Sequence, residues 1–206
     1  MMENKIKLNV ISNRKLCENE NLEKQIEKIF SAYEKKIILK NFEIVALTLR
    51  EKDLDKNGYL NLVEKIYPIC KKHKINLILH QNYDLNLDDK YMIEGLHLSY
   101  EIFKSLNKNI REGLIKKYKR IGVSIHSLDE AKEAESLGAT YVVAGHIFET
   151  DCKKDLKPRG LKFVEDLSSV LIIPIFAIGG IDEKNSQSVI DSGAFSVCMM
   201  SSLMKY

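Results

Sequence analysis

Short apolar runs alternate with amphipathic segments along the whole chain. The runs are rich in β-branched residues and are bounded by polar or glycine-containing stretches, which is typical of β-strands. Strands are predicted over residues 7–12, 44–47, 76–79, 95–98, 121–124, 141–144, 173–178 and 195–199. Because helical patterns separate these runs, the strands are expected to lie parallel to one another.

Between the runs, apolar residues recur at helical spacing with polar residues between them. Helices are predicted over residues 22–33, 60–70, 85–92, 100–118, 128–137 and 183–192, the third of them short and poorly patterned. Ser127 and Glu130 have the spacing of a capping box, and Gly138 suits the left-handed turn that ends a helix. Asp182 can cap the last of these helices, and Gly193 can end it.

A closed (β/α)8 barrel of the TIM type is the simplest fold for this order of elements, because closure removes the exposed edges of the sheet. The chain ends a few residues after the last predicted strand, so the last helix must be truncated. With 206 residues and no linker or repeat, the chain is expected to form one domain over residues 1–206. A doubly wound open sheet is the alternative fold.

Composition is that of an ordinary soluble protein, with 45% hydrophobic and 30% charged residues and a net charge of +3. The lysines are scattered along the predicted helices, which argues against a nucleic-acid partner. The N-terminus has no apolar signal region, and no segment has the ~20 apolar residues that cross a bilayer, so a cytoplasmic protein without a membrane partner is expected. Free thiols are expected for the widely separated cysteines, Cys17, Cys70, Cys152 and Cys198.

Histidines recur where the predicted strands end, which in a barrel is the end that carries the chemistry. They are His80, His97, His126 and His146. The segment 144–154 adds a threonine and two lysines to His146, so it can transfer a proton and hold an anion. Hydrogen-bonded packing is the alternative role for His97 and His126, and a zinc site is not favoured because local ligand spacing is absent. His73 lies in the last turn of a helix, where a structural role is expected.

Gly179 and Gly180 follow the seventh predicted strand, where the absence of a Cβ lets backbone amides approach a ligand closely. Ser201 and Ser202 follow the last strand and open the short last helix. Phosphate sites in barrels commonly form from the loops after strands seven and eight together with a helix N-terminus. These loops therefore predict a phosphate site, with a tight turn that binds nothing as the alternative.

Several motifs resemble those of the thiamine phosphate synthase and thiazole tautomerase superfamily, and the resemblance spans most of the chain. The motifs similar to both branches cover residues 49–52, 122–127 and 177–181. The segment 145–154, with 158–160 after it, resembles the tautomerase branch in particular. Synthases typically carry a proline where His146 stands in this chain.

The chain departs from the synthase branch where the resemblance implies magnesium ligands. A synthase needs magnesium to neutralise the pyrophosphate that leaves. This chain has His80 and Gln81 in place of an asparagine–aspartate pair, and Ile102 in place of a second aspartate. Thr48 stands where a glutamine is expected. We therefore expect neither a metal nor a cofactor.

The resemblance thus implies a thiazole tautomerase of thiamine biosynthesis. Such an isomerase converts an exocyclic-alkylidene thiazole carboxylate phosphate into its aromatic isomer by a proton shift on the bound ring, without a cofactor. His146 is the predicted catalytic residue, because an imidazole can both accept and donate a proton near neutral pH.

The implied substrate carries a phosphate and a carboxylate, so two anion sites are expected. The phosphate is expected to lie on the backbone amides of Gly179, Gly180, Met200 and Ser201. Arg50 or Lys153 is expected to pair with the carboxylate, Arg50 through a planar bidentate fork, with surface ion pairing as the alternative role. His126 either orients the ring or packs below it.

Two other functions stay open. The first is a magnesium-dependent thiamine phosphate synthase, a transferase, that recruits other ligands for its metal. The second is a non-catalytic or regulatory protein that binds a thiazole phosphate through the same anion site. The partner in each case is a small-molecule thiazole phosphate, and the sequence leaves association into a homo-oligomer open.

Overall fold

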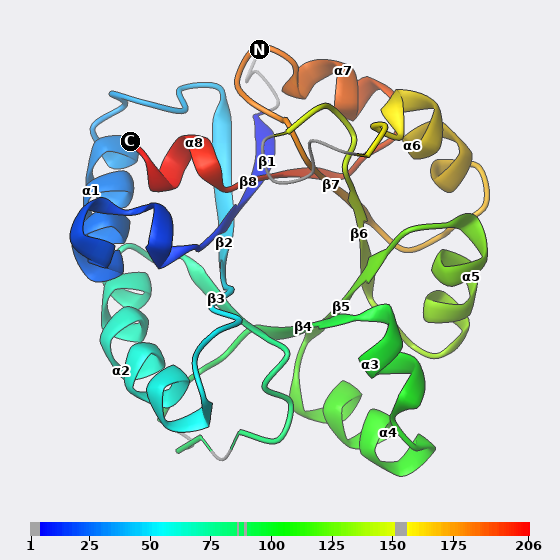
Figure 1. Cartoon of the computed structure of the whole chain (residues 1–206), viewed down its shortest axis with the longest axis horizontal. Coiled ribbons are helices and arrows are strands. Elements are labelled where there is room, and N and C mark those ends of the chain that lie inside the picture. Colours follow the sequence, from blue (N-terminus) through cyan, green and yellow to red (C-terminus); the bar gives the residue numbers. More distant parts are fainter. Residues whose placement is uncertain (1–4, 86, 89, 151–155) are drawn as a thin grey trace. The chain divides into compact units, whose positions relative to one another are not determined.

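Eight parallel strands close into a barrel in sequence order, with helices between strands, in the computed structural model (Figure 1). The structure describes residues 5–85, 87–88, 90–150 and 156–206. The strands are β1 (Ile6–Ile11), β2 (Phe42–Leu49), β3 (Asn76–His80), β4 (Gly95–Ser99), β5 (Arg120–Ile125), β6 (Tyr141–Gly145), β7 (Ile175–Ile178) and β8 (Ser196–Met199). The predicted (β/α)8 fold is confirmed, and the doubly wound open sheet is wrong.

The chain divides into two compact units. The first unit comprises residues 1–94 and 199–206, and it holds β1 to β3 with three of the helices. The second unit comprises residues 95–198, and it holds β4 to β7, the remaining helices and all of β8 except its last residue. The assignment of residues 1–206 to one domain stays a prediction.

Helices α1 (Leu22–Glu34) and α2 (Lys56–Lys72) follow β1 and β2 in the first unit, at the positions that the apolar spacing predicts. Each begins at a side-chain cap. The side chain of Asn21 accepts a hydrogen bond from an amide at 2.9 Å, and that of Asp55 accepts one at 2.8 Å. Two short 3-10 turns, η1 (Arg14–Leu16) and η2 (Glu18–Glu20), connect β1 to α1.

The truncated last helix, α8 (Ser201–Met204), is anchored to α1 within the first unit (Figure 1). Gln25 on α1 is buried, and its side-chain amide donates to the carbonyl of Leu203 at 2.6 Å. Lys28 donates to the carbonyl of Tyr206 and lies 4.5 Å from the centroid of its ring. A single helical turn is unstable alone, so these contacts with α1 hold the end of the chain in place.

His73 ends α2 and joins it to α1, in keeping with the predicted structural role. Its Nδ1 lies 2.8 Å from an oxygen of Glu34, and its Nε2 lies 3.2 Å from an oxygen of Glu27. Lys72 also donates to Glu27, and this bond is the main reason that the pKa of Glu27 lies below its ordinary value. The ring of His73 further meets the edge of Phe30, with centroids 5.6 Å apart.

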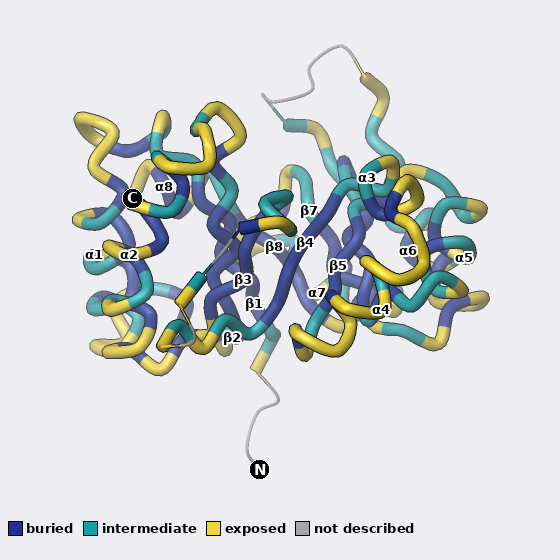
Figure 2. Tube along the Cα trace, turned by 90° about the horizontal axis from the view of Figure 1, so that it is seen from below, coloured by how far each residue is buried: buried dark blue, intermediate teal, exposed yellow. Residues whose placement is uncertain are grey.

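The helices of the second unit are α3 (Tyr100–Ser105), α4 (Lys108–Lys117), α5 (Leu128–Ser136), α6 (Gly160–Ser168) and α7 (Ser186–Asp191). Their outward sides are exposed whereas the strands are buried (Figure 2). At the start of α5, Ser127 accepts from the amide of Glu130 at 3.1 Å, as the capping box predicts. The carboxylate of Glu130, however, accepts from the amide of His126 at 2.6 Å, one residue earlier than in a standard box.

Two predicted helices are wrong. The described residues of 85–92 form no helix; the side chain of Asp88 bonds to the backbone there, accepting from the amide of Lys90 at 2.9 Å. The helix predicted over 100–118 is broken into α3 and α4. Asn107 lies at the break and accepts from the amide of Ile110 at 3.0 Å, so it starts a second helix.

Asp182 does not cap α7. Its carboxylate accepts from the amides of Lys184 and Asn185, at 2.8 and 3.1 Å, and closes a turn before the helix begins. Strand β7 also starts later than predicted, because Pro174 has no amide to contribute to the sheet ladder. Gly138 and Gly193 have positive φ at the ends of α5 and α7, as predicted.

The core of the second unit is built around Tyr141, whose ring crosses β5 at Gly122. A Cβ on Gly122 would lie only 2.0 Å from Cζ of Tyr141, so only glycine fits. The ring packs on Phe176, with centroids 4.5 Å apart. The Tyr141 hydroxyl is buried without a hydrogen-bond partner among the described residues, and burial raises its pKa well above the ordinary value.

No helix in the described ranges is both long and apolar enough to cross a membrane. Cys17, Cys70 and Cys198 are buried and, within the part of the chain that the structure describes, form no disulfide. The fourth cysteine, Cys152, lies outside the described residues.

Candidate functional site

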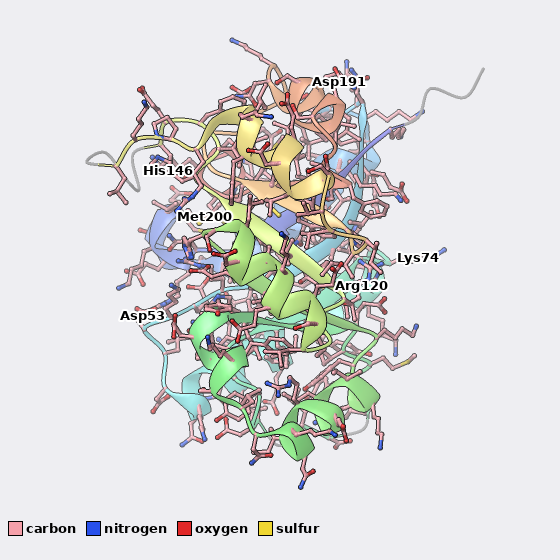
Figure 3. All side chains as sticks on the ribbon, turned by 90° about the vertical axis from the view of Figure 1, so that its right-hand side faces the viewer. Asp53, Lys74, Arg120, His146, Asp191 and Met200 are labelled. Carbon is pink, nitrogen blue, oxygen red and sulfur yellow. The ribbon has the colours of Figure 1, made fainter. Side chains whose placement is uncertain are left out.

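Polar residues follow the carboxyl ends of strands in both units. In the second unit, His146 follows β6 and lies at the end opposite Arg120, the first residue of β5 (Figure 3). In the first unit, Asp53 follows β2 and lies at the end opposite Lys74, which precedes β3 (Figure 3). Active sites of (β/α)8 barrels lie at the carboxyl ends of the strands.

The turn at Gly179 and Gly180 closes against the loop after β6. The carbonyl of Gly179 accepts from the amide of Phe148 at 2.9 Å, and that of Gly180 from the side chain of Asn185 at 2.8 Å. Both glycines have positive φ, +112° and +63°. If residue 179 had a Cβ, it would lie 2.7 Å from Cα of His146. A Cβ on residue 180 would lie 2.3 Å from the backbone oxygen of Glu149. These bonds use the carbonyls of the turn. A phosphate is bound by backbone amides, so the bonds that hold this turn do not compete with a phosphate.

His146 is buried, with 3% of its surface exposed, and its backbone is left-handed with φ +62°. A non-glycine residue in this region is strained and persists only where its neighbours fix it. The amide of Arg159 donates to the carbonyl of His146 at 2.8 Å, and the amide of Ile147 to that of Ile178 at 3.2 Å. Nε2 of His146 has no hydrogen-bond partner among the described residues. Since an unpaired buried nitrogen is unfavourable, a ligand that bonds to it would be stabilised there.

Arg159 ties the loop after β6 to the end of β5. Its Nη1 donates to the carbonyl of Gly145 at 3.0 Å, and its Nε donates to the carbonyl of His126 at 3.2 Å. The side chain of His126 is half-exposed, with Nδ1 3.5 Å from a carboxylate oxygen of Glu130. His126 is therefore linked to the His146 loop through one guanidinium, and its side chain is not packed in the interior.

His97 and His80 are buried in their strands. Nε2 of His97 lies 2.8 Å from the hydroxyl of Ser124, and its ring centroid lies 5.8 Å from that of Tyr141. The backbone amide of His80 donates to the hydroxyl of Tyr59 at 2.9 Å. These contacts accord with hydrogen-bonded packing, the alternative role for His97.

Arg50 directly follows β2, and its amide donates to the hydroxyl of Ser12 at 2.7 Å. Ser12 in turn donates to the buried carboxylate of Glu51 at 2.7 Å. Arg14 donates to Glu51 and, with two nitrogens, to Asp53 at 2.6 and 2.8 Å. The bond with Arg14 holds the pKa of Asp53 well below its usual range, and Asp53 raises the pKa of Arg14. The charge of Arg14 is thus already matched by carboxylates of the protein.

The remaining predicted residues are Met200, Ser201 and Lys153. Met200 precedes α8, and its carbonyl accepts from the amides of residues 203 and 204 at 3.1 and 2.9 Å. Ser201 opens α8 and is half-buried. Lys153 lies outside the described residues. The second unit brings together Gly179, Gly180 and His146, whereas Arg50, Met200 and Ser201 belong to the first unit.

The residues at the implied magnesium positions do not fit that ion. His80 ends β3, Gln81 follows it and Ile102 lies in α3, so none of the three supplies the carboxylate oxygens that magnesium prefers. Glu51 and Asp53 do carry carboxylates, but both accept hydrogen bonds from Arg14. Within the described ranges, no three His, Cys, Asp or Glu side chains form a group that could hold a metal ion.

Sequence reasoning assigned no role to Glu51, Arg159 or Asn185. Glu51 and Arg159 lie within the motifs 49–52 and 158–160. The position of Glu51 beside Arg50 at a strand end is a signal in the sequence that could have indicated a role for it. Asn185 had none, because its bond to Gly180 depends on the turn that Asp182 closes.

Comparison with known proteins matches the chain to the family model described as "Thiamine monophosphate synthase" over residues 8–203. A protein of Clostridium acetobutylicum named thiamine-phosphate synthase is 30% identical, covering 96% of this chain and 87% of its own. One of Halalkalibacterium halodurans with the same name is 33% identical, covering 77% and 73%. The solved thiamine phosphate pyrophosphorylase of Pyrococcus furiosus aligns with a TM-score of 0.77 at 23% identity, over 100% of this chain and 91% of that one.

These findings correct the expected activity. An isomerase is wrong, because the relatives are named synthases, which are transferases. The superfamily resemblance is confirmed, but nothing in these names singles out the tautomerase branch. A synthase, one of the alternatives from the sequence, agrees with them better.

Proposed function

This chain belongs to the thiamine monophosphate synthase family, and from that membership we propose that it is a transferase of the thiamine-phosphate synthase kind. In the proposed reaction a pyrimidine pyrophosphate is joined to a thiazole phosphate. The ring nitrogen of the thiazole supplies an electron pair and forms a bond to the carbon of the pyrimidine substrate that carries the pyrophosphate. The bond from that carbon to the pyrophosphate oxygen breaks, and pyrophosphate leaves with its electron pair. Both substrates are small-molecule phosphates.

The observation that carries the proposal is the turn at Gly179 and Gly180. Side chains are excluded at both positions by backbone atoms within 2.7 Å of a would-be Cβ, and the hydrogen bonds that hold the turn use its carbonyls. Amide groups at the carboxyl end of a barrel strand are suited to a phosphate. We assign the thiazole phosphate to these amides, and we retain Met200 and Ser201 as further predicted contacts.

His146 is the proposed catalytic residue. Its buried Nε2, which lacks a partner among the described residues, would bond to the substrate and hold a proton or donate a hydrogen bond as charge develops. Arg50 and Lys153 are proposed to pair with the pyrophosphate, Arg50 through its planar fork. His126 is proposed to orient the ring from its half-exposed position. Since magnesium does not fit the residues present, no step here depends on it.

A non-catalytic thiazole-phosphate-binding protein is the second candidate. It is favoured by one observation, the replacement of the implied metal carboxylates by Gln81 and Ile102. Such a protein would bind the thiazole phosphate on the same glycine turn but would not form the product.

The test is to mix the purified chain with both substrates and to measure pyrophosphate release and product by chromatography, with magnesium and with a chelator. A transferase releases pyrophosphate only when both substrates are present. Binding of the thiazole phosphate without release would select the second candidate. Neither release nor binding would overturn both.

His146→Asn is the sharpest variant in this assay. Asparagine tolerates the left-handed backbone at φ +62°, so the substitution removes the ring nitrogen without straining the chain. We expect turnover to fall about 100-fold, with little change in melting temperature. His146→Ala is the matched control for backbone strain. Alanine lacks the ring nitrogen and also tolerates the left-handed backbone less well than asparagine does. Unchanged turnover in His146→Asn would remove His146 from the site.

A further inference from the structure

Glu51 is a buried carboxylate in the first unit whose oxygens are both occupied by the protein. The side chain is 2% exposed. Oε1 accepts from the hydroxyl of Ser12 at 2.7 Å and from the backbone amide of Arg14 at 3.1 Å. Oε2 accepts from the same amide at 3.1 Å and from Nη1 of Arg14 at 3.3 Å. One carboxylate thus holds two points of the segment that follows β1.

Ser12 relays this contact to Arg50. Its hydroxyl donates to Glu51, and the same oxygen accepts the amide hydrogen of Arg50 at 2.7 Å. The amide of Ser12 also donates to the carbonyl of Thr48 at 3.0 Å, so Ser12 is bonded to the residues on both sides of Leu49, the last residue of β2. Ser12 is fully buried, and its hydroxyl therefore has a fixed direction. The backbone of Arg50 is held through this hydroxyl.

Arg14 is the counterion of this network rather than a residue for substrate. Its guanidinium donates to Asp53 with two nitrogens, at 2.6 and 2.8 Å, in addition to Glu51. Nearby, burial together with the charge of Glu51 raises the pKa of the Cys17 thiol to about 11. Arg50, whose backbone amide bonds to Ser12, is the cation that directly follows β2.

A buried ion pair contributes little net stability compared with apolar residues of the same volume, whereas it fixes one geometry. Here the ion pair fixes the position of the segment after β1 relative to the end of β2, where Arg50 lies. Binding groups must be held to within a fraction of an ångström by the residues that support them. The bonds from Glu51 through Ser12 to the amide of Arg50 can hold Arg50 in this way.

We propose that Glu51 is a positioning residue, which acts through Ser12 to hold Arg50 in register for an anionic substrate group of the pyrophosphate class. The inference rests on the proposed function, in which Arg50 pairs with the pyrophosphate. In Glu51→Gln, an NH2 group replaces one acceptor oxygen. Either orientation of the amide loses an accepted bond, from Ser12 or from Arg14.

The experiment measures the Kd of inorganic pyrophosphate for the full chain by titration calorimetry, with melting temperatures recorded alongside. Arg50→Ala and Glu51→Gln are each expected to weaken binding about tenfold. The double variant is expected to bind no worse than Arg50→Ala alone, because Glu51 acts through Arg50. This coupling is a readout that a purely structural role would not produce.

Asp53→Asn is the matched control. It also removes an acidic partner of Arg14, but that partner is exposed and does not touch Ser12. Its Kd for pyrophosphate is expected to stay within about twofold of the unaltered protein. If Glu51→Gln fails to fold, Ser12→Ala removes the relay directly and is expected to weaken binding in the same way.

Additive losses in Glu51→Gln and Arg50→Ala, or a normal Kd in Glu51→Gln beside a weakened Arg50→Ala, would overturn the inference and leave the proposed function standing. A normal Kd in Arg50→Ala would overturn both the inference and the role proposed for Arg50. No pyrophosphate binding by the unaltered protein would overturn the proposed function and, with it, the inference.

Discussion

The carboxylate of Glu51 in the first unit accepts from a hydroxyl, an amide and a guanidinium, whereas Nε2 of His146 and the hydroxyl of Tyr141 in the second unit bond to none of the described residues. Both groups of side chains are buried near strands of the same barrel. Among the described residues of the first unit, every buried side-chain nitrogen and oxygen thus has a hydrogen-bond partner. The second leaves a strained histidine with an unused nitrogen.

The difference indicates that the buried polar groups of the first unit hold its structure, whereas those of the second are open to a ligand. A network with every oxygen occupied holds a loop in one position, because any other position would leave a buried charge unpaired. An unpaired buried nitrogen beside a glycine turn has the opposite property, since a ligand can supply the missing bond. We therefore expect substitutions in the first unit to act mainly on stability and position, and those at the glycine turn to act mainly on binding.

Gly179→Ala should have the largest effect. The new Cβ would lie within 2.8 Å of two backbone atoms of His146, at a backbone φ of +112° that alanine resists. We expect turnover in the pyrophosphate-release assay to fall about 100-fold or more. Gly113→Ala in α4 is the control, because its Cβ would meet nothing within 4 Å. Normal turnover in Gly179→Ala would show that the turn is not part of the site.

Glu51→Gln should be the largest stability effect among the polar substitutions. The Gln amide keeps only one acceptor oxygen, so either the guanidinium of Arg14 or the hydroxyl of Ser12 is left short of an acceptor in a buried site. The free energy of unfolding is expected to fall by about 3 kcal/mol, as measured by urea denaturation. Asp53→Asn, at an exposed carboxylate, is expected to show no such fall. Equal effects in the two variants would contradict the view that burial of Glu51 matters.

Tyr141→Phe should change stability in the other direction. The substitution removes a buried hydroxyl that no described residue bonds to, while the ring that packs on Phe176 stays. We expect the free energy of unfolding to rise by about 1 kcal/mol. A loss of that size in the same denaturation experiment would show that the hydroxyl has a partner, and that the second unit is as fully bonded as the first.

Acid should produce the smallest effect, which in the first unit can be followed at Glu27. The pKa of Glu27 is lowered, chiefly by its bond with Lys72, so its stabilising contribution is present above its ordinary pKa and is lost as pH falls through the lowered value. The melting temperature is therefore expected to drop below about pH 4.3, and Glu27→Gln should reduce that drop. An unchanged acid profile in Glu27→Gln would show that the contact of α1 with His73 and Lys72 adds nothing.

The barrel could be predicted from the sequence because parallel buried strands leave apolar runs, and because Ser127 and Gly138 mark the ends of α5 by local chemistry. The position of His146 after β6 followed from the same pattern. Its positive φ and unpaired Nε2 could not be predicted, since they arise from bonds with Arg159 and the close approach of Gly179. The break at Asn107 was missed because its cap competes with helical spacing that continues through it.

The most direct test of the central claim, that amides of the glycine turn hold the substrate phosphate, is a titration of ¹⁵N-glycine-labelled protein with the thiazole phosphate, followed by NMR. We predict that the amide signals of Gly179 and Gly180 shift most, and that Gly113 in α4 does not move. Saturable binding that leaves the signals of Gly179 and Gly180 unchanged would contradict the account.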